Sequence, residues 1–386
     1  MIILNNLNDA KLIIRILNRE GFDAFIVGGA VRDHLLKMPL NDIDITTSAK
    51  PEEVLKFFKG VPTGVKYGTV TIEFRENKYE VTTFRSESGY SDFRRPEVVN
   101  FETDVKEDVL IRDFTINGLL MDSNGDIIDH VGGIKDLENK VIKTIGLPAE
   151  RFNEDALRML RAFYFQSKLG FEIEADTLLS ININRHLIKE VAAERVLDEM
   201  NKMLKGKHLL KAFDSILKTQ VDEFLPGLSK GIKYLNETKQ DPKPIIFYSL
   251  AFSLNKIIPS YWKFSNNYRY KLKQIVELVN NNRMFNNEDL YHYGLETVLQ
   301  ANEVRTVLKQ KIQSYKTLEK MYSDLEIKSS LDLKFRGRDI LQITNRKAGA
   351  WVNNLINEIV NKVINKELEN DYEILKDFVV KNFERF

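Results

Sequence analysis

Hydrophobic and polar residues follow two different periods along the chain. In the first part, residues 10–21 and 29–38 have the spacing of amphipathic helices. Short runs rich in β-branched residues predict strands at residues 24–29, 42–47, 68–74, 79–85, 119–122 and 126–131. After Pro148 helical spacing dominates to the end of the chain. We therefore expect an α/β part with a small mixed sheet, followed by an all-helical part.

Composition bounds the class of protein. The chain has 386 residues, 43% of them hydrophobic and 29% charged, which is enough for a core and for more than one domain. It has no cysteine, so disulfides and thiolate zinc sites are excluded. No apolar run approaches the length of a membrane span, and residues 1–22 lack the layout of a signal peptide. We expect a cytoplasmic protein that does not bind membranes.

Charge is unevenly distributed although the net charge is only +1. Residues 1–205 are acidic overall, whereas residues 206–285 are basic. A basic stretch of this kind can neutralise phosphates, or it can be a solvated helical surface. Charge alone does not decide between these two interpretations.

Two aspartates lie side by side in one predicted strand. Residues two apart in an extended strand point to the same face, so Asp42 and Asp44 face away from Ile43 and Ile45. The two carboxylates repel each other unless a cation lies between them. Mg²⁺ prefers such oxygen ligands. We therefore expect Asp42 and Asp44 to bind Mg²⁺.

A glycine pair precedes this strand. Gly28 and Gly29 end one predicted strand and begin a helix, so their backbone can approach a ligand closely. The N–H groups of a helix start suit phosphate, and Arg32 lies within reach of the same phosphate. Alone, a glycine pair is more often a structural turn. Beside Asp42 and Asp44, it predicts a triphosphate cradle next to a metal-binding strand.

These motifs resemble those of the class II tRNA nucleotidyltransferases, the CCA-adding enzymes of the DNA polymerase β-like superfamily. The segment IRDFTINGLLMD is similar to the second motif of that family, carried by Arg112, Asp113 and Asn117. The segment NEDALRMLRAF is similar to its nucleotide-selecting motif, carried by Glu154, Asp155, Arg158 and Arg161. Further similarity lies around Glu194 and Arg195 and in the tail segments FRGRDILQI and GAWVNNLINEI.

The resemblance implies a fold and a reaction. The fold is a seahorse-shaped chain with a nucleotidyltransferase head and an all-α neck, body and tail. We expect the boundaries 1–145 for the head, 146–205 for the neck, 206–285 for the basic body and 286–386 for the tail. The reaction is template-independent addition of C, C and A to the 3′ end of tRNA from CTP and ATP, with release of pyrophosphate. The oligomeric state is not implied.

The chemistry of the residues agrees with that reaction. Phosphoryl transfer depends on positioning and charge neutralisation, and metal ions at Asp42 and Asp44 would activate the 3′-hydroxyl and stabilise pyrophosphate. A third carboxylate often joins such a pair, and the sequence does not decide whether it is Glu80 or Asp113. We expect nucleotide binding by Gly28, Gly29, Arg32, Arg112, Asp113, Asn117, Glu154, Asp155, Arg158 and Arg161.

Base selection follows from hydrogen-bonding capacity. An ionised aspartate only accepts and an arginine only donates. Arg158 lies three residues after Asp155, which predicts one helical face for both. The pair complements the amino donor and ring-nitrogen acceptor shared by cytosine and adenine, whereas uracil and guanine oppose a carbonyl oxygen to the carboxylate. The alternative is an intrahelical ion pair with no ligand.

Two segments modify this picture. Tyr164 stands where the family often carries a further arginine, so a triphosphate contact is weaker or another cation supplies it. Residues 86–101 lack a regular pattern and are similar to a flexible loop that helps the family shift from C to A addition. Asp92, Arg94 and Arg95 are present in it, which favours full CCA addition.

The acceptor and the rival functions remain to be tested. We expect contact with the backbone of tRNA, which is recognised by shape, from four cations interleaved with aromatic residues in the basic stretch: Lys263, Arg269, Lys271 and Lys273. The alternatives are an A-adding or CC-adding enzyme, a poly(A) polymerase, a non-catalytic RNA-binding protein and a nucleotidyltransferase for small molecules. Intact Asp42 and Asp44 argue against a non-catalytic protein, and the long basic helical part argues against a small acceptor.

Overall fold

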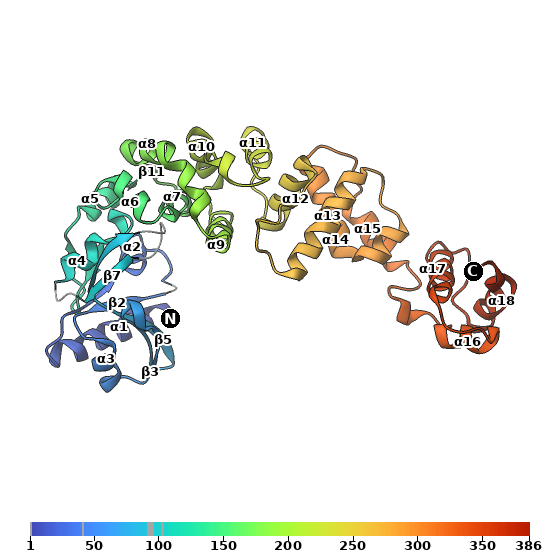
Figure 1. Cartoon of the computed structure of the whole chain (residues 1–386), viewed down its shortest axis with the longest axis horizontal. Helices are drawn as coiled ribbons and strands as arrows, with labels where there is room; N and C mark the ends of the chain where they lie inside the picture. The colour runs from blue at the N-terminus through green and yellow to red at the C-terminus, as the bar shows by residue number, and fades with distance from the viewer. Residues whose placement is uncertain (1, 41, 91–95, 102–103) are drawn as a thin grey trace. The chain divides into compact units, whose positions relative to one another are not determined.

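The computed structural model describes residues 2–40, 42–90, 96–101 and 104–386 and divides the chain into two compact units (Figure 1). The first unit holds Met1–Asp241 and Tyr261–Lys263, and the second holds Pro242–Ser260 and Phe264–Phe386. The finer division into head, neck, body and tail stays a prediction.

Seven strands of the first unit form one sheet in the order β3-β4-β5-β2-β1-β8-β9. Their bounds are β1 Ala24–Val27, β2 Asp44–Thr47, β3 Gly60–Gly64, β4 Thr69–Phe74, β5 Asn77–Thr83, β8 Leu119–Met121 and β9 Ile127–Asp129. Strands β2 and β5 are parallel, and the other neighbours are antiparallel. The predicted mixed sheet is therefore confirmed. In this register Asp44 lies opposite Glu80.

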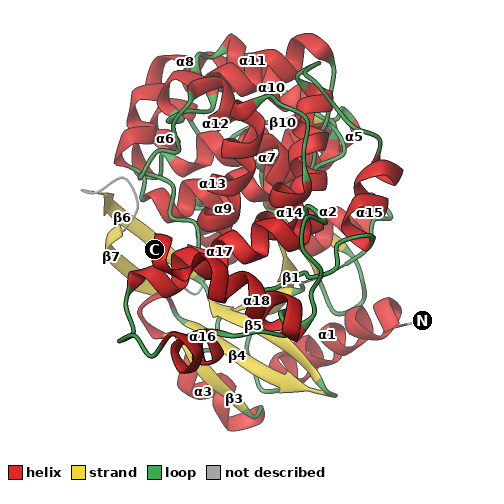
Figure 2. Cartoon of the chain, turned by 90° about the vertical axis from the view of Figure 1, so that its right-hand side faces the viewer, coloured by secondary structure: helices red, strands yellow, loops and turns green. Residues whose placement is uncertain are grey.

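Helices pack on this sheet (Figure 2). Helix α1 contacts β1 and β2, and α3 contacts β3, β4 and β5. The helices of this part are α1 Ile2–Arg19, α2 Gly29–Leu35, α3 Pro51–Phe57, α4 Val105–Leu110 and α5 Gly133–Glu138. Ile13, Ile26 and Ile45 are fully buried between the layers. Their burial fixes the register, because a shift of β2 by one residue would turn Ile45 out of the core and Asp44 into it.

Residues 86–101 contain a hairpin. Strand β6 Arg85–Tyr90 pairs antiparallel with β7 Pro96–Phe101 as a separate two-stranded sheet. The interpretation of this segment as one without regular structure is therefore wrong. An antiparallel pair with a solvent-facing side needs no continuous apolar pattern, so the polar sequence concealed it. Asp92, Arg94 and Arg95 lie outside the described residues.

The rest of the first unit is mostly helical. Its helices are α6 Pro148–Glu154, α7 Leu157–Leu169, α8 Ala175–Asn184, α9 Ala193–Met203, α10 Leu209–Lys218 and α11 Ser229–Thr238. One short strand, β11 Glu172–Ile173, interrupts the predicted all-helical neck. It pairs in parallel with β10 Val141–Ile142, which lies within the predicted head. Helix α7 packs against both α9 and α10. The break between α6 and α7 falls inside the nucleotide-selecting motif.

The second unit is helical as predicted. Its helices are α12 Pro244–Asn255, α13 Asn266–Asn281, α14 Asn287–Val307, α15 Tyr315–Ser323, α16 Gly337–Thr344, α17 Ala350–Ile364 and α18 Tyr372–Asn382. Phe247, Leu272 and Val298 are fully buried in its core. Within the part of the chain that the structure describes, a membrane-crossing helix is absent, since each helix is too short or too polar.

Candidate active site

Three carboxylates gather where β2 meets its neighbour β5. Ile43 and Ile45 are buried, whereas Asp42 and Asp44 are exposed, which is the alternation that the strand pattern predicts. Glu80 of β5 lies opposite Asp44. Asp44 reaches solvent, but the protein atoms around its carboxyl partly desolvate it and raise its pKa. The negative charges of Glu80 and Asp42 raise this pKa further, and the positive charge of Arg112 lowers it.

This donor set fits a divalent cation. Carboxylate oxygens are the ligands of hard ions, and a cation between Asp42, Asp44 and Glu80 would remove the repulsion that raises the pKa of Asp44. Over residues 2–40, 42–90, 96–101 and 104–386, no three His, Cys, Asp or Glu side chains already converge to hold a metal ion. The remaining coordination positions would therefore be filled by water or by oxygen atoms of a ligand.

Gly28 lines the same cavity as Asp42 and Asp44, and its backbone has a positive φ. Gly28 has φ 75°, a conformation that other residues rarely adopt, and its N–H donates to the Leu119 carbonyl at 3.2 Å. A Cβ at this position would lie 3.4 Å from Nη1 of Arg112. Arg112 also donates to Asp108 at 2.9 Å. The positive φ, rather than a lack of space, therefore favours glycine at this position.

Arg32 is held inside the turn that follows. Its Nε donates to Oδ1 of Asp33 at 2.8 Å, and its Nη1 donates to Oδ1 of Asn117. Its guanidinium also lies over the Phe165 ring, 5.0 Å from the centroid. The predicted residues Arg32 and Asn117 are therefore in direct contact, although 85 positions separate them.

Asp113 is committed to an ion pair. Its Oδ2 accepts from Nε and Nη2 of Arg161 at 2.8 and 2.6 Å, and its Oδ1 accepts from Asn117 and from the Phe114 N–H. Burial would raise the pKa of Asp113, but Arg161, Asn117 and the Phe114 N–H together lower it to about 2. Of the two candidates for a third carboxylate, Asp113 is already paired with Arg161, whereas Glu80 lies opposite Asp44 on the neighbouring strand.

This ion pair supports a stability prediction. Asp113→Asn should lower the free energy of unfolding at pH 7 by about 2 kcal/mol, because the lowered pKa of Asp113 marks a carboxylate stabilised in the fold. That contribution is complete above the unfolded-state pKa and is lost as pH falls through the lowered value. Urea unfolding of both proteins should show a difference that shrinks below about pH 5. An equal difference at pH 7 and at acid pH would contradict this origin.

The nucleotide-selecting motif is built differently from the prediction. Helix α6 ends at Glu154, Asp155 has extended backbone angles, and α7 begins at Leu157. The prediction that Asp155 and Arg158 share one helical face is therefore wrong. Asp155 instead accepts from Nη1 and Nη2 of Arg195 on α9, at 3.1 and 2.7 Å. Arg195 belongs to the later neck motif, but sequence reasoning did not place it in the site.

Arg158 is fixed by other groups. Its Nη1 donates to Glu154 at 2.7 Å and to the Arg151 carbonyl at 3.1 Å, and its Nη2 donates to the Ile111 carbonyl at 3.0 Å. Arg151 also donates from Nη2 to the Ile111 and Arg112 carbonyls, at 2.6 and 2.9 Å. Glu154 therefore orients Arg158, and both arginines connect helices α6 and α7 to the backbone that carries Arg112.

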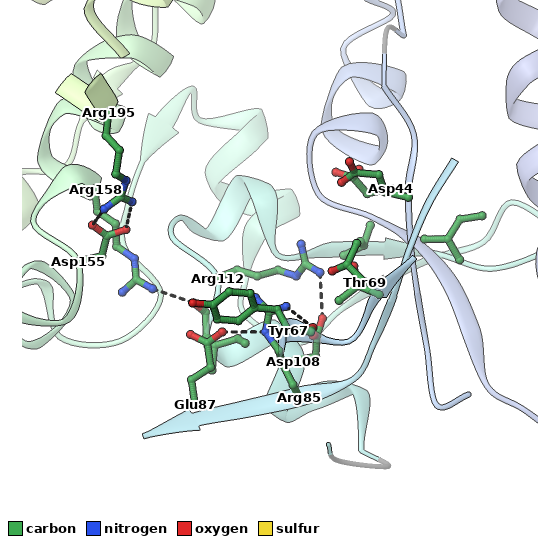
Figure 3. Close-up of a pocket in the computed structure, with 15 residues that line it drawn as sticks. Asp44, Tyr67, Thr69, Arg85, Glu87, Asp108, Arg112, Asp155, Arg158 and Arg195 are labelled. Atoms are coloured by element: carbon green, nitrogen blue, oxygen red, sulfur yellow. Dashed lines mark hydrogen bonds and ion pairs between the residues drawn. The ribbon is translucent and has the colours of Figure 1, made fainter. Parts of the chain in front are cut away.

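Two adjoining cavities run between these groups. The glycine-side chamber, of about 630 Å³, is lined by Gly28 and Gly29; the hairpin-side chamber, of about 500 Å³, is lined by Arg85 and Glu87 of β6 (Figure 3). The two chambers share Asp44, Arg112, Asp155 and Arg158. The glycine-side chamber is also lined by the predicted residues Arg32, Asp42, Asp113, Asn117 and Arg161. Among the predicted metal- and nucleotide-binding residues, Glu154 lies outside both linings.

The hairpin-side chamber contains residues that sequence reasoning missed. Arg85 donates to Glu87 at 2.7 Å and to the Tyr67 carbonyl at 2.9 Å (Figure 3). Asp108 accepts from both Arg112 and Thr46, at 2.9 and 3.2 Å. No motif marked these residues, because only the tertiary fold brings α4 and β6 to the cavity that Asp44 lines.

The four predicted RNA-binding cations lie far along the chain from this cleft. Lys263 and Lys273 are exposed, whereas Lys271 forms an ion pair with Glu296 at 2.6 Å. The guanidinium of Arg269 lies 5.9 Å from the Phe264 ring centroid. Trp262, one of the interleaved aromatics, is fully buried and donates to the Pro226 carbonyl.

A mixed sheet with one aspartate just before β2 and one at its start, a glycine turn before them and arginines along both cavities is typical of the nucleotidyltransferase class. Family comparisons agree: a "Poly A polymerase head domain" matches residues 24–143, a "Probable RNA and SrmB- binding site of polymerase A" matches 170–232, and a "tRNA nucleotidyltransferase domain 2 putative" matches 254–379.

Curated relatives are similar over the whole chain. The CCA-adding enzyme of Pediococcus pentosaceus is 36% identical, over 97% of both chains, and that of Enterococcus faecalis is 37% identical, over 98% of this chain and 96% of the relative. The crystal structure of the Bacillus stearothermophilus CCA-adding enzyme in complex with CTP matches with a TM-score of 0.86 and 32% identity, over 98% of both chains. The chain belongs to the family of CCA-adding enzymes.

Proposed function

We propose that the protein adds C, C and A to the 3′ end of tRNA from CTP and ATP, releasing pyrophosphate at each step. One observation carries the proposal: residues predicted for metal, triphosphate and base binding line two adjoining cavities, which share Asp44, Arg112, Asp155 and Arg158. The similarity to CCA-adding enzymes over 97% of the chain supports the same reaction.

The residues divide the work by their position in the cleft. Asp42 and Asp44, with Glu80, would hold Mg²⁺, which supplies charge neutralisation at the triphosphate and activates the 3′-hydroxyl. Gly28, Gly29 and Arg32 would bind the phosphates in the glycine-side chamber. Arg112 lines both chambers, so it would contact the phosphate nearest the reacting bond or the ribose.

Base reading would fall to Asp155 and Arg158, which belong to both chambers. Each is held by a separate partner, Arg195 and Glu154 respectively, so the reading edge is preorganised before a base arrives. Preorganised groups discriminate well, because a mismatched base leaves buried polar atoms unpaired. Asp113 and Arg161 bind each other and line the glycine-side chamber, so this pair would stabilise that side of the site.

Incubation of the purified protein with tRNA lacking its 3′ end, Mg²⁺ and labelled CTP and ATP tests the function directly. Sequential addition of C, C and A is the expected result. Residues 86–101, which are similar to the loop that helps the family shift from C to A addition, support complete CCA addition. Products that stop at CC, or A added only to tRNA ending in CC, would assign a partial-specificity enzyme. Long A tails on arbitrary RNA would assign a poly(A) polymerase. A cytoplasmic location stays a prediction.

Backbone recognition of tRNA supports a further prediction. The double variant Lys263→Gln and Lys273→Gln removes two exposed cations and should weaken tRNA binding several-fold and reduce its salt dependence. Binding of CTP should be unchanged. Filter binding at several salt concentrations measures both effects, and an unchanged salt dependence would remove these lysines from the tRNA-binding surface.

A further inference from the structure

A lysine faces the glycine-side chamber beside the residues assigned so far. Lys168 lies near the end of α7 and lines this chamber together with Gly28 and Gly29. Its Nζ donates to Oδ2 of Asp33 at 2.9 Å, and its side chain is 26% exposed. The ammonium is therefore held in place and still accessible to a ligand.

Asp33 connects this lysine to the glycine turn. Arg32 contacts Oδ1 of Asp33 through Nε and Nη2, at 2.8 and 2.7 Å, whereas Lys168 takes Oδ2. One carboxylate between two cations leaves one positive charge unbalanced in this cluster. An ammonium has three N–H donors, and the contact with Asp33 uses one of them. The cluster is therefore suited to an anion in the chamber.

The helix face around Lys168 supports the same conclusion. Tyr164 lies one turn earlier on α7 and also lines the chamber, but it carries no charge at neutral pH. Arg161, one further turn back, already gives both Nε and Nη2 to Asp113. Of the three positions on this face, Lys168 therefore offers the positive charge least committed to the protein itself.

The position of Lys168 indicates which phosphates it would meet. Asp44 and Arg112 line both chambers, so the reacting phosphate belongs at the boundary between the chambers. Lys168 lines the glycine-side chamber but not the hairpin-side chamber, together with Gly28, Gly29 and Arg32, where the proposed function places the triphosphate. A triphosphate that starts at the boundary would extend its distal phosphates toward Lys168.

We propose that Lys168 is a nucleotide-binding residue that contacts the β- and γ-phosphates of CTP or ATP and the pyrophosphate product, and that Asp33 positions it. This inference rests on the proposed function, because it takes a nucleoside triphosphate as the ligand of the chamber. A lysine acts on phosphate as a point charge, so its contribution should follow the number of distal phosphates and ignore the base.

Calorimetric titration of the full chain, without tRNA and with Mg²⁺, tests the proposal. Lys168→Met should weaken binding of CTP and of pyrophosphate about tenfold and leave binding of CMP within about twofold. Lys168→Arg should restore most of the affinity. An unchanged affinity for CTP would overturn the proposal, and so would an equal loss for CTP and CMP, since that pattern indicates a rearranged turn at Arg32.

A matched control and a second readout separate this inference from the proposed function. Lys205→Met removes an exposed lysine outside both chambers and should change none of these affinities. If Lys168→Met loses affinity for CTP as expected but the wild type adds no nucleotide to tRNA, the proposed function fails and the binding role stands. If the wild type completes CCA and Lys168→Met binds CTP normally, the binding role alone fails.

Discussion

Replacing Asp44 with asparagine is expected to slow addition of both C and A by about 1,000-fold or more. Asparagine keeps the shape of the side chain and the pairing of β2 with β1 and β5. It removes the negative charge that is needed to bind the metal ion at the triphosphate. Ile45 remains buried on the opposite face, so the sheet should not change. Rates of single-nucleotide incorporation with CTP and with ATP measure the effect.

The same substitution should stabilise the protein in the absence of divalent metal. Partial desolvation by the surrounding protein and the charges of Glu80 and Asp42 raise the pKa of Asp44 against the opposing effect of Arg112, so the fold disfavours the charged carboxylate. A carboxyl group whose pKa is raised in the folded state favours folding at low pH, and this stabilisation is lost as pH rises through the raised pKa. At neutral pH the charge of Asp44 therefore destabilises the metal-free fold. A higher melting temperature of Asp44→Asn in EDTA would separate lost catalysis from lost folding.

Two further variants complete this test. Asp42→Ala should abolish both additions in the same way, because it removes the other carboxylate of the pair. Asp126→Asn changes an exposed aspartate of the same domain, outside both chambers, and should retain full activity. Activity of Asp44→Asn or Asp42→Ala within a few-fold of the wild type would mean that the divalent ion is held elsewhere.

The short range of the first motifs explains why the sequence predicted them well. The predicted strand over residues 42–47 begins only at Asp44, but the alternating burial of residues 42–45 follows the local period of an extended chain. A strand that ends in two glycines likewise predicts its own turn, and Gly28 has the positive φ that such a turn requires. Local rules therefore suffice to find the metal strand and the phosphate turn.

Partners that are distant in the sequence could not be predicted in this way. Glu80 faces Asp44 only because β5 is the parallel neighbour of β2, and strand order is a property of the whole sheet. Asp155 binds Arg195, 40 positions away, instead of Arg158, three positions away. No proline or glycine marks the break at Asp155, so the periodic pattern ran on as one helix.

Replacing Asp155 with alanine is expected to reduce the preference for CTP over UTP, and for ATP over GTP, by about 10- to 100-fold. The carboxylate accepts a hydrogen bond from the amino group of cytosine or adenine and repels the carbonyl oxygen that uracil or guanine presents. Without the carboxylate, cytosine or adenine loses a hydrogen-bond acceptor, and uracil or guanine no longer meets a repulsive negative charge. The ratio of kcat/KM for each nucleotide pair on one tRNA measures the change.

Arg195 provides the matched variant, because it positions Asp155 and is not itself proposed to contact the base. Its two nitrogens bind the two carboxylate oxygens at 3.1 and 2.7 Å, a forked geometry that lysine cannot reproduce. Arg195→Lys keeps the charge and frees the carboxylate to rotate, so selectivity should fall in the same direction as in Asp155→Ala but by less.

The affinity for tRNA distinguishes base reading from a structural role. Asp155 lies at the junction of α6 and α7, where its Oδ1 also accepts from the Leu157 N–H at 3.1 Å. If this junction only shaped the neck, Asp155→Ala would weaken tRNA binding and slow all four nucleotides equally. A fall confined to tRNA affinity would therefore contradict the reading role. A selective gain of UTP and GTP at constant tRNA affinity requires that the carboxylate face the base.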